Sequence, residues 1–381
     1  MHLQEKWVGY FKDLNLCPTE SRRKGFQMSI IKQSFGKTKD GQKATLYTIE
    51  NKNGMKVSFC DYGALIVGIY VPDRNGKIED IALGYDDVSG YEDNGCGFGS
   101  FIGRHANRIG GAKFEIDGKT YELAKNDNGI NNLHSGPVGY NHMMYDVEVF
   151  TDEDSTSIAF SRLSPDGEQG FPGDLDVTVT YTVTDDNELA IEYFAVSDKK
   201  TVINLTNHTY FNLAGQASGD ILDQEVWVKS DKITPTDKFL IPTGEFMDVT
   251  GTPMDFRTPK KVGKDINADF APLKMAGGYD HNYALNLEIE EDEMDLVASL
   301  YDEKSGRFME VYTDLPGMQL YSGNFMRKET GKGGAQYDRR HGICFETQFF
   351  PNACNTPAFE SSIFDADVPF DYCTVYAFSV K

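Results

Sequence analysis

The feature that most constrains the fold is a recurrence of short runs rich in Val, Ile, Thr, Tyr and Phe, separated by turns of Gly, Asn and Asp. Such runs are typical of β-strands, and the turn residues between them mark where the chain reverses. In the run at 176–183, apolar residues alternate with threonines, which predicts one buried face and one wetter or covered face. Asp117-Gly118 favours a tight type I′ hairpin turn. The sequence therefore predicts an all-β protein, built as a large antiparallel sandwich.

Strands are expected from about residue 34 to the C-terminus, where long helical periodicity is almost absent. The clearest expected strands are 44–50, 55–60, 64–71, 78–83, 114–116, 120–123, 176–183, 189–196, 225–229, 294–301, 307–313, 319–323 and 375–380. Because no linker and no clean repeat divides this part of the chain, we predict a single β-sandwich domain over residues 31–381.

The N-terminal extension, residues 1–30, has a different pattern. Its apolar residues fall at helical spacing, namely at Leu3, Trp7, Tyr10, Phe11 and Leu14. This spacing predicts a short amphipathic helix that caps the body. Acidic residues such as Glu5 and Asp13 argue against a signal peptide or a mitochondrial presequence.

Charge and cysteine content exclude several classes of function. The net charge of -22 repels phosphate backbones and anionic lipids, so neither nucleic acid nor a membrane is an expected partner. Six cysteines are scattered without a CxxC pair or a zinc-type spacing, which indicates reduced thiols in a cytoplasmic protein. No stretch reaches the roughly 20 apolar residues that a membrane-spanning helix needs.

Two stretches combine titratable residues with a strand-like pattern. Residues 204–212 read Asn-Leu-Thr-Asn-His-Thr-Tyr-Phe-Asn, and their period of two allows one face to line a cleft. His208 within it can give or take a proton near neutral pH. Glu346 lies in an apolar and aromatic run at 342–351, where an unpaired carboxylate costs several kcal/mol or has a raised pKa. Either a structural salt bridge or a general base explains Glu346.

Three other segments concentrate polar residues in loops. Residues 103–109 contain two arginines, which either stitch a turn or bind vicinal hydroxyls. Residues 126–136 form an Asn- and Gly-rich loop that ends near His134, a histidine that is either incidental or exposed in a concavity. Asp280, within 277–283, either caps a turn or accepts hydrogen bonds from a polyol.

Six blocks together carry a family resemblance, and they occur in the family's order. The blocks are 103–109, 131–134, 166–173, 204–213, 278–281 and 345–348. From about residue 35 to the C-terminus, the sequence resembles the aldose 1-epimerases, also called galactose mutarotases. The resemblance implies a large antiparallel β-supersandwich and an enzyme that needs no metal or other cofactor.

The resemblance also implies the residues of the site. His208 matches the general acid and Glu346 the general base. The positions that hold the hydroxyls and ring oxygen of the sugar correspond to Asn107, Arg108, His134, Asp280 and Gln319. Two departures, Ser135 where glycine is common and Asn352 where aspartate is usual, are candidates for a change in sugar preference.

The implied reaction interconverts the α and β anomers of free hexoses such as galactose and glucose by opening and reclosing the hemiacetal ring. Glu346 would take the proton of the C1 hydroxyl and His208 would protonate O5, and the two are expected on opposite sides of the sugar. A nearby carboxylate is expected to raise the pKa of His208 and so favour its protonated form.

Two alternatives keep the same fold. A hexose-6-phosphate 1-epimerase would want extra Arg or Lys at the pocket rim, which the acidic chain disfavours. A non-catalytic sugar-binding protein needs no matched acid and base, so the presence of both His208 and Glu346 argues against it. No metal site is predicted, because His134 and His208 lack metal-type spacing. The expected partner is a free aldose, bound by a monomer or a homodimer.

Overall fold

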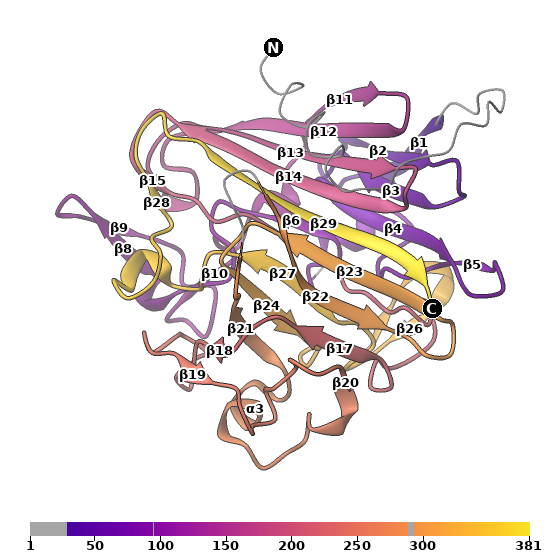
Figure 1. Ribbon diagram of the computed structural model, residues 1–381. Helices are drawn as coiled ribbons and strands as arrows, with labels where there is room; N and C mark the ends of the chain where they lie inside the picture. The colour runs from indigo at the N-terminus through magenta and orange to yellow at the C-terminus, as the bar shows by residue number, and fades with distance from the viewer. Residues whose placement is uncertain (1–28, 94, 289–292) are drawn as a thin grey trace.

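The computed structural model describes residues 29–93, 95–288 and 293–381 (Figure 1). The amphipathic helix predicted within residues 1–30 lies almost wholly outside the described residues. Regular structure is nearly all β, and every pair of strands in the described sheets is antiparallel. The prediction of an all-β antiparallel fold is therefore confirmed.

The largest sheet has nine strands and crosses the whole molecule (Figure 1). In spatial order its strands are β11 (Asp146–Thr151), β12 (Ser155–Ser164), β13 (Leu175–Thr184), β14 (Glu188–Ser197), β29 (Phe370–Val380), β23 (Arg307–Thr313), β22 (Asp295–Tyr301), β17 (Glu225–Val228) and β20 (Lys260–Lys261). The C-terminal strand β29 lies at its centre, between β14 and β23. The last residues of the chain therefore join the two halves of the sheet.

Two five-stranded sheets accompany the large one. The first consists of β1 (Ser29–Lys37), β2 (Lys43–Glu50), β3 (Lys56–Cys60), β4 (Leu65–Pro72) and β5 (Ile78–Asp80). The second, here called the site sheet, consists of β19 (Met247–Asp248), β18 (Lys232–Ile233), β21 (Asp280–Ala284), β24 (Gly317–Tyr321) and β27 (Cys344–Gln348).

Short elements complete the fold. The remaining strands are β6 (Ser100–Ile102), β7 (Arg108–Ile109), β8 (Lys113–Ile116), β9 (Lys119–Glu122), β10 (Asn132–Leu133), β15 (Thr201–Val202), β16 (Thr206–His208), β25 (Glu329–Thr330), β26 (Gln336–Tyr337) and β28 (Ile363–Phe364). The α-helices are α2 (Val88–Glu92) and α3 (Ala271–Ala276), and the 3-10 turns are η1 (Gly110–Ala112), η2 (Tyr140–His142), η3 (Glu168–Gly170), η4 (Val262–Lys264), η5 (Lys332–Gly334) and η6 (Ala353–Asn355). No helix among these described elements is long and apolar enough to cross a bilayer.

The expected strands agree with the observed ones, mostly to within one to three residues at each end. The hairpin at Asp117-Gly118 is confirmed, because both residues have the positive φ of a type I′ turn, +51° and +78°. Strands β11 and β12 were not predicted. In β12, Ile158 and Phe160 are buried, but the serines and the arginine that flank them weaken the apolar pattern.

The main core lies between the large sheet and the two smaller ones. Phe59 of β3 stacks on Tyr181 of β13 with ring centroids 4.8 Å apart, and Leu320 and Phe345 of the site sheet join the same apolar cluster. Burying an apolar side chain of this size contributes about 1.5–3 kcal/mol. Because side chains alternate along a strand, the neighbours of Phe345 in β27 must point away from this core.

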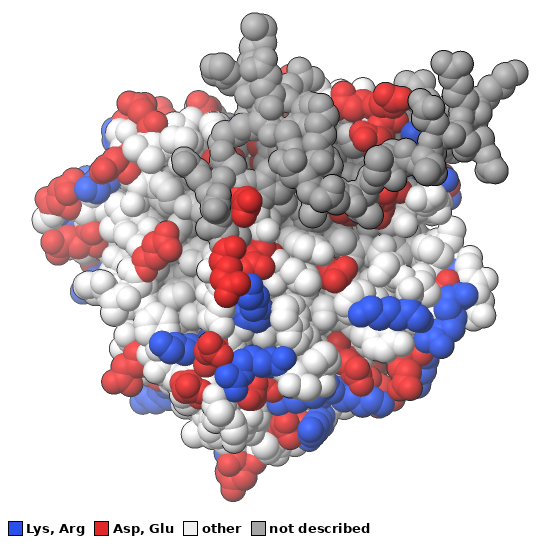
Figure 2. Space-filling view, viewed as in Figure 1, with Lys and Arg blue, Asp and Glu red and all other residues white. Residues whose placement is uncertain are grey.

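Surface charge is mixed in sign despite the large negative total. Figure 2 shows acidic side chains spread over one face, with Lys and Arg gathered toward its lower part. Both signs are present on this face, so local residues, and not the net charge of -22 alone, decide what a pocket attracts.

Candidate active site

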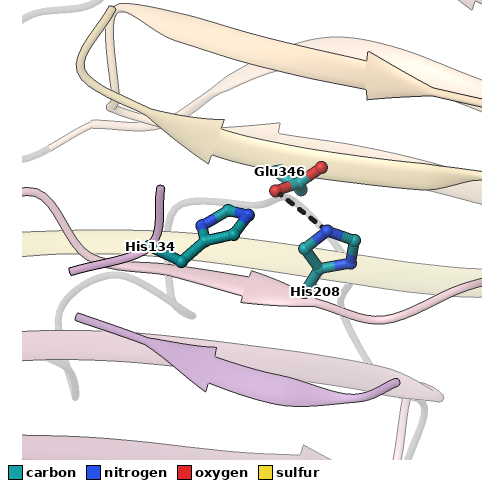
Figure 3. Close-up of side chains that lie close together, drawn as sticks. All are labelled: His134, His208 and Glu346. Atoms are coloured by element: carbon teal, nitrogen blue, oxygen red, sulfur yellow. Dashed lines mark ion pairs between the residues drawn. The ribbon is translucent and has the colours of Figure 1, made fainter. Parts of the chain in front are cut away.

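A histidine and a glutamate from separate strands meet on the face of the site sheet that points away from the apolar core. His208 ends β16, which pairs with β6 so that His208 lies opposite Ser100. Glu346 is the central residue of β27. The two side chains point toward each other, with His134 beside them (Figure 3). The Nε2 atom of His208 lies 3.6 Å from Oε2 of Glu346, and the two side chains are 9% and 3% exposed.

The strand register explains why other polar residues share this face. Gln319 of β24 lies opposite Glu346, and Asn282 of β21 lies opposite Gln319. Cross-strand partners point to the same side of a sheet, so these side chains form a row. Asp280 also faces this side, two residues along β21 from Asn282, and its Oδ1 accepts a 2.6 Å hydrogen bond from Nε2 of Gln319.

The opposite wall comes from two loops that are bonded to each other. The backbone N–H of Asn107 donates to Nδ1 of His134 over 3.1 Å, and the backbone N–H of His134 donates to the Asn107 carbonyl over 3.0 Å. Arg108 follows in β7, which pairs with β10 just before His134. Both Asn107 and His134 have positive φ, +58° and +52°, a backbone strain typical of functional loops.

Arg108 is held in place by a residue that sequence analysis did not assign. Its Nε donates to Oδ2 of Asp127 over 3.2 Å, and both side chains are largely buried, at 11% and 12% exposure. Burial raises the pKa values of Asp280 and Glu346, and the charge of Arg108 opposes this rise in both. The site therefore contains a cation, the guanidinium of Arg108, whose orientation is held by its hydrogen bond to Asp127.

All seven sequence-predicted site residues belong to this one connected arrangement. Besides Asp127, sequence analysis missed two residues that contact His208. The Sγ atom of Cys344 lies 3.6 Å from Nδ1 of His208, and the ring of Tyr321 meets the imidazole edge-on at 6.1 Å between centroids. The period of two along β27 would have placed Cys344 on the same face as Glu346, but only the fold shows that His208 lies there.

Burial sets the protonation of the pair. Removal from water lowers the pKa of His208 to about 4 and raises the pKa of Glu346 well above its usual range, an effect that Asp280 increases and Arg108 opposes. Burial therefore favours the neutral form of both groups, the unprotonated imidazole of His208 and the protonated carboxyl of Glu346. The expectation that the pKa of His208 is raised is wrong, because desolvation lowers this pKa and outweighs the backbone hydrogen bond that raises it.

The relative placement of the pair also differs from the expectation. A separation of 3.6 Å between Nε2 of His208 and Oε2 of Glu346 leaves no room for a sugar ring between them. The two groups therefore lie side by side and not on opposite sides of a sugar. This arrangement still suits a hemiacetal. Because O1 and O5 are both bonded to C1, O1 can face Glu346 while O5 faces the neighbouring His208.

The donor atoms of His134, His208 and Glu346 lie within 4.8 Å of one another, a spacing compatible with a metal ion. The hydrogen bond from the Asn107 backbone to Nδ1 of His134 requires that this neutral histidine carries its proton on Nε2. The Nε2 atom, which is the one free to face the site, is then a hydrogen-bond donor and not a metal ligand. This tautomer suits a ligand oxygen better than a cation.

The two departures from the family pattern act on the backbone. Ser135 has a φ of +67°, and its hydroxyl accepts from the His105 N–H and donates to the His105 carbonyl. The side-chain oxygen of Asn352 accepts from the N–H of Gly110 over 2.9 Å, and the backbone N–H of Asn352 donates to the Arg108 carbonyl. Both residues therefore support the segment that carries Asn107 and Arg108.

Comparison with solved structures places the fold in a known class. The chain superposes on an aldose epimerase homologue from C. elegans with a TM-score of 0.78 and 30% identity, covering 87% of this chain and 98% of that one. A galactose 1-epimerase from Lactobacillus acidophilus gives a TM-score of 0.81 at 26% identity, covering 93% and 99%. The protein is thus an enzyme of the galactose mutarotase-like β-supersandwich class.

Sequence comparison narrows the class to a family. The sequence model of the aldose 1-epimerase family matches residues 45–367. A galactose mutarotase from Bos taurus is 42% identical over 327 residues, which cover 86% of this chain and 92% of that protein. The chain belongs to the aldose 1-epimerase family and is an isomerase that interconverts sugar anomers.

Proposed function

We propose that the protein interconverts the α and β anomers of free hexoses such as galactose and glucose, with Glu346 as general base and His208 as general acid. The observation that carries the assignment is the 3.6 Å approach of Nε2 and Oε2 in a buried site. Glu346 has no Lys or Arg within ion-pair distance among the described residues, and its Oε2 accepts no hydrogen bond there. A purely structural carboxylate would be paired.

The pair works by sharing one proton. Before a sugar binds, burial favours the protonated form of Glu346. Hydrogen bonds from sugar hydroxyls, together with the charge of Arg108, stabilise the carboxylate and favour transfer of the proton to His208. Glu346 then takes the proton of the C1 hydroxyl while His208 protonates O5, and the ring opens. After rotation about the C1–C2 bond the two transfers run in reverse, and the ring closes on the other face.

The remaining site residues are proposed to hold the sugar. Asn107, Arg108 and His134 line one wall, where the Nε2–H of His134 donates to a sugar oxygen, and Asp280 and Gln319 line the other. Gln319 already donates to Asp280, so its free Oε1 and the second oxygen of Asp280 are the acceptors offered to hydroxyls. No step of this chemistry requires a metal or another cofactor.

A neutral sugar suits the site better than a phosphorylated one. Arg108 is the cation whose charge acts on Glu346 and Asp280, and its Nε is already bonded to Asp127. A dianionic phosphate would want several unpaired cations. We therefore propose a free aldose as substrate.

The setting of the enzyme follows from the same residues. We propose that residues 31–381 act as one domain, because the core cluster draws on the large sheet and both five-stranded sheets. The cysteines that the structure describes, at 60, 96, 344, 354 and 373, are all free thiols, which supports a cytoplasmic location. We propose that the enzyme works there as a monomer or a homodimer.

Polarimetry tests the proposal directly. Freshly dissolved α-galactose and α-glucose are followed with and without the protein, and acceleration of the approach to the anomeric equilibrium is expected. The same assay is run with a hexose 6-phosphate, for which little acceleration is expected. Binding of the sugars without acceleration of either would indicate a sugar-binding protein and contradict the proposal.

A further inference from the structure

A pair of buried amides lies beside Glu346 and has no part in the mechanism above. Asn282 of β21 and Gln348 of β27 are 2% and 0% exposed. Nε2 of Gln348 donates to Oδ1 of Asn282 over 3.4 Å. This bond leaves Nδ2 of Asn282, a donor, and Oε1 of Gln348, an acceptor, without partners among the described residues. Because buried polar atoms are nearly always paired, an amide pair with one free donor and one free acceptor indicates a ligand group that completes it.

A glycine allows the two amides to meet. They sit on β21 and β27 and reach each other over Gly317 of β24, which lies opposite Gln348 in the register. A Cβ atom at Gly317 would lie 2.7 Å from Oδ1 of Asn282, closer than real Cβ contacts allow. The amide pair therefore borders the same patch of the site face as Gln319 and Glu346, each of which also has an unpaired oxygen.

The missing partner has the chemistry of a hydroxyl group. A hydroxyl donates one hydrogen bond and accepts others, so a single O–H can donate to Oε1 of Gln348 and accept from Nδ2 of Asn282. A phosphate or a carboxylate offers only acceptors and would leave Oε1 unpaired. An ammonium offers only donors and would leave Nδ2 unpaired.

The position of the pair selects one hydroxyl of the sugar. The imidazole of His208 lies on the Cys344 side of Glu346, because Nδ1 is 3.6 Å from Sγ of Cys344. Gln348 lies two residues from Glu346 in the opposite direction along β27. In an aldopyranose, C1 carries the ring oxygen on one side and C2 on the other. If O1 faces Glu346 and O5 faces His208, the C2 substituent is directed toward Gln348.

We propose that Asn282 and Gln348 form a subsite for the C2 hydroxyl of the bound aldose. This inference rests on the proposed roles of His208 and Glu346, since they set the direction of the ring. It makes Asn282 and Gln348 specificity-determining residues. The enzyme should select for the presence and configuration of the C2 hydroxyl, in addition to the hydroxyls held by the residues named above.

The test compares galactose with 2-deoxygalactose in the wild type and in two near-isosteric variants, Gln348→Met and Asn282→Leu. Enzyme-dependent kcat/KM is measured by polarimetry after subtraction of the spontaneous rate. The wild type should lose roughly 10-fold or more on 2-deoxygalactose, the cost of two unmade hydrogen bonds. Each variant should lose a similar factor on galactose, with little further loss on 2-deoxygalactose.

Asn51→Ala provides the matched control. Asn51 is an equally buried amide, 1% exposed and bonded to the Thr184 carbonyl at a strand end outside the site. The Asn51→Ala substitution should change kcat/KM for galactose and for 2-deoxygalactose by the same factor. A comparison that needs no variant uses the wild type with 6-deoxygalactose and with the C2 epimer of galactose, and the epimer should be the poorer substrate.

Equal losses on galactose and 2-deoxygalactose in both amide variants would overturn the subsite and make the pair structural. Equal kcat/KM of the wild type for galactose and 2-deoxygalactose would overturn it as well, even if the variants failed to fold. Either result would leave the proposed function intact. Failure of the wild type to accelerate any of these sugars would instead overturn the proposed function, and this inference with it.

Discussion

The two faces of the site sheet are equally buried but chemically opposite. On one face, Leu320 and Phe345 belong to the apolar core and are 0% and 1% exposed. On the other, Gln319 and Glu346 are 4% and 2% exposed, and each has an oxygen without a hydrogen-bond partner. The same strands, read at alternate residues, thus give a stabilising face and a reactive one.

The contrast shows where the protein carries unsatisfied polarity. A buried polar atom without a partner costs free energy of about 1–3 kcal/mol, more for a charged group. The core face, with large apolar clusters, supplies the stability that allows several such atoms on the site face. Substitutions on the two faces should therefore separate stability from activity.

The largest expected effect comes from removing the acid or the base. Glu346→Gln, and separately His208→Asn, should lower kcat by about 10²–10⁴, because each removes a proton-transfer group. For Glu346→Gln, the unfolding temperature should stay close to that of the wild type, since the shape of the side chain is kept. Polarimetry and thermal unfolding measure the two quantities, and a variant that retains more than about a tenth of the rate contradicts the assigned role.

Substitutions on the core face of the site sheet should lower stability and leave the activity of the folded protein almost unchanged. Leu320→Ala should lower the free energy of unfolding by about 2–5 kcal/mol, because it leaves a cavity in the core. Activity per folded molecule should change little. Denaturant unfolding gives the stability, and the rate is normalised to the folded fraction. A loss of specific activity as deep as that of Glu346→Gln would show that the two faces are not separable.

Stability should fall as the solution becomes acidic. Burial lowers the pKa values of His208 and His281 to about 4 and that of His105 to about 3, from a usual value of 6.5. Between pH 6.5 and 4 the unfolded chain takes up protons that the folded chain refuses, so stability is complete above 6.5 and is lost toward 4. The shift at His208 alone corresponds to roughly 3 kcal/mol.

Denaturant unfolding at several pH values measures this dependence. The matched variant is His208→Asn, which should show a flatter curve between pH 6.5 and 4 because one of the histidines with a lowered pKa no longer titrates. The contributions of His281 and His105 should remain. An identical slope in the wild type and the variant would mean that His208 does not titrate with a lowered pKa.

Activity should persist into the acid range. The reaction requires that the pair His208 and Glu346 holds one proton in total. When both groups are protonated, neither can act as the base. Since the pKa of His208 is about 4, kcat/KM of the wild type should keep most of its value at pH 6 and fall below about pH 4. An acid limb centred near 6.5, the usual histidine value, would contradict the effect of burial.

The smallest expected effect concerns Asp127, which accepts a hydrogen bond from Arg108. Asp127→Asn should raise KM by a few-fold with a smaller change in kcat, since it weakens the charge-assisted bond that directs the guanidinium. Asp127→Ala and Arg108→Lys, combined in a double-mutant cycle, should show losses that are not additive. Additive losses would mean that Asp127 does not act through Arg108.

Local patterns were enough to predict most of the longer strands, although β1, β11, β12 and β21 were not among those expected. The alternation over 176–183 and the Asp117-Gly118 turn are encoded in neighbouring residues, so their strand and hairpin were predicted correctly. β12 was missed because its Ser and Arg residues lie on a partly exposed face, while Ile158 and Phe160 alone carry the apolar signal. The order of strands in a sheet, and which strand lies at its edge, depend on contacts between residues that are far apart in the sequence.

For the site, the sequence supplied the residue types and the family resemblance supplied their roles. Together they pointed to His208 and Glu346 as a pair. The expected direction of the pKa shift of His208 was wrong, and so was the expected placement of the two side chains on opposite sides of the sugar. Both errors have one cause. The pKa and the separation depend on desolvation and on strand register, which arise only when β16 packs on β27.

The sequence by itself therefore determined an all-β chain, its turns, its alternating faces and the chemical groups available for acid–base catalysis, because these follow from short-range periodicity and side-chain chemistry. Only the tertiary structure decided which polar groups would be buried together, which partner fixes Arg108, and which amides were left with a free donor and a free acceptor. These properties depend on residues far apart in the chain, whose distances are set when three sheets share one core.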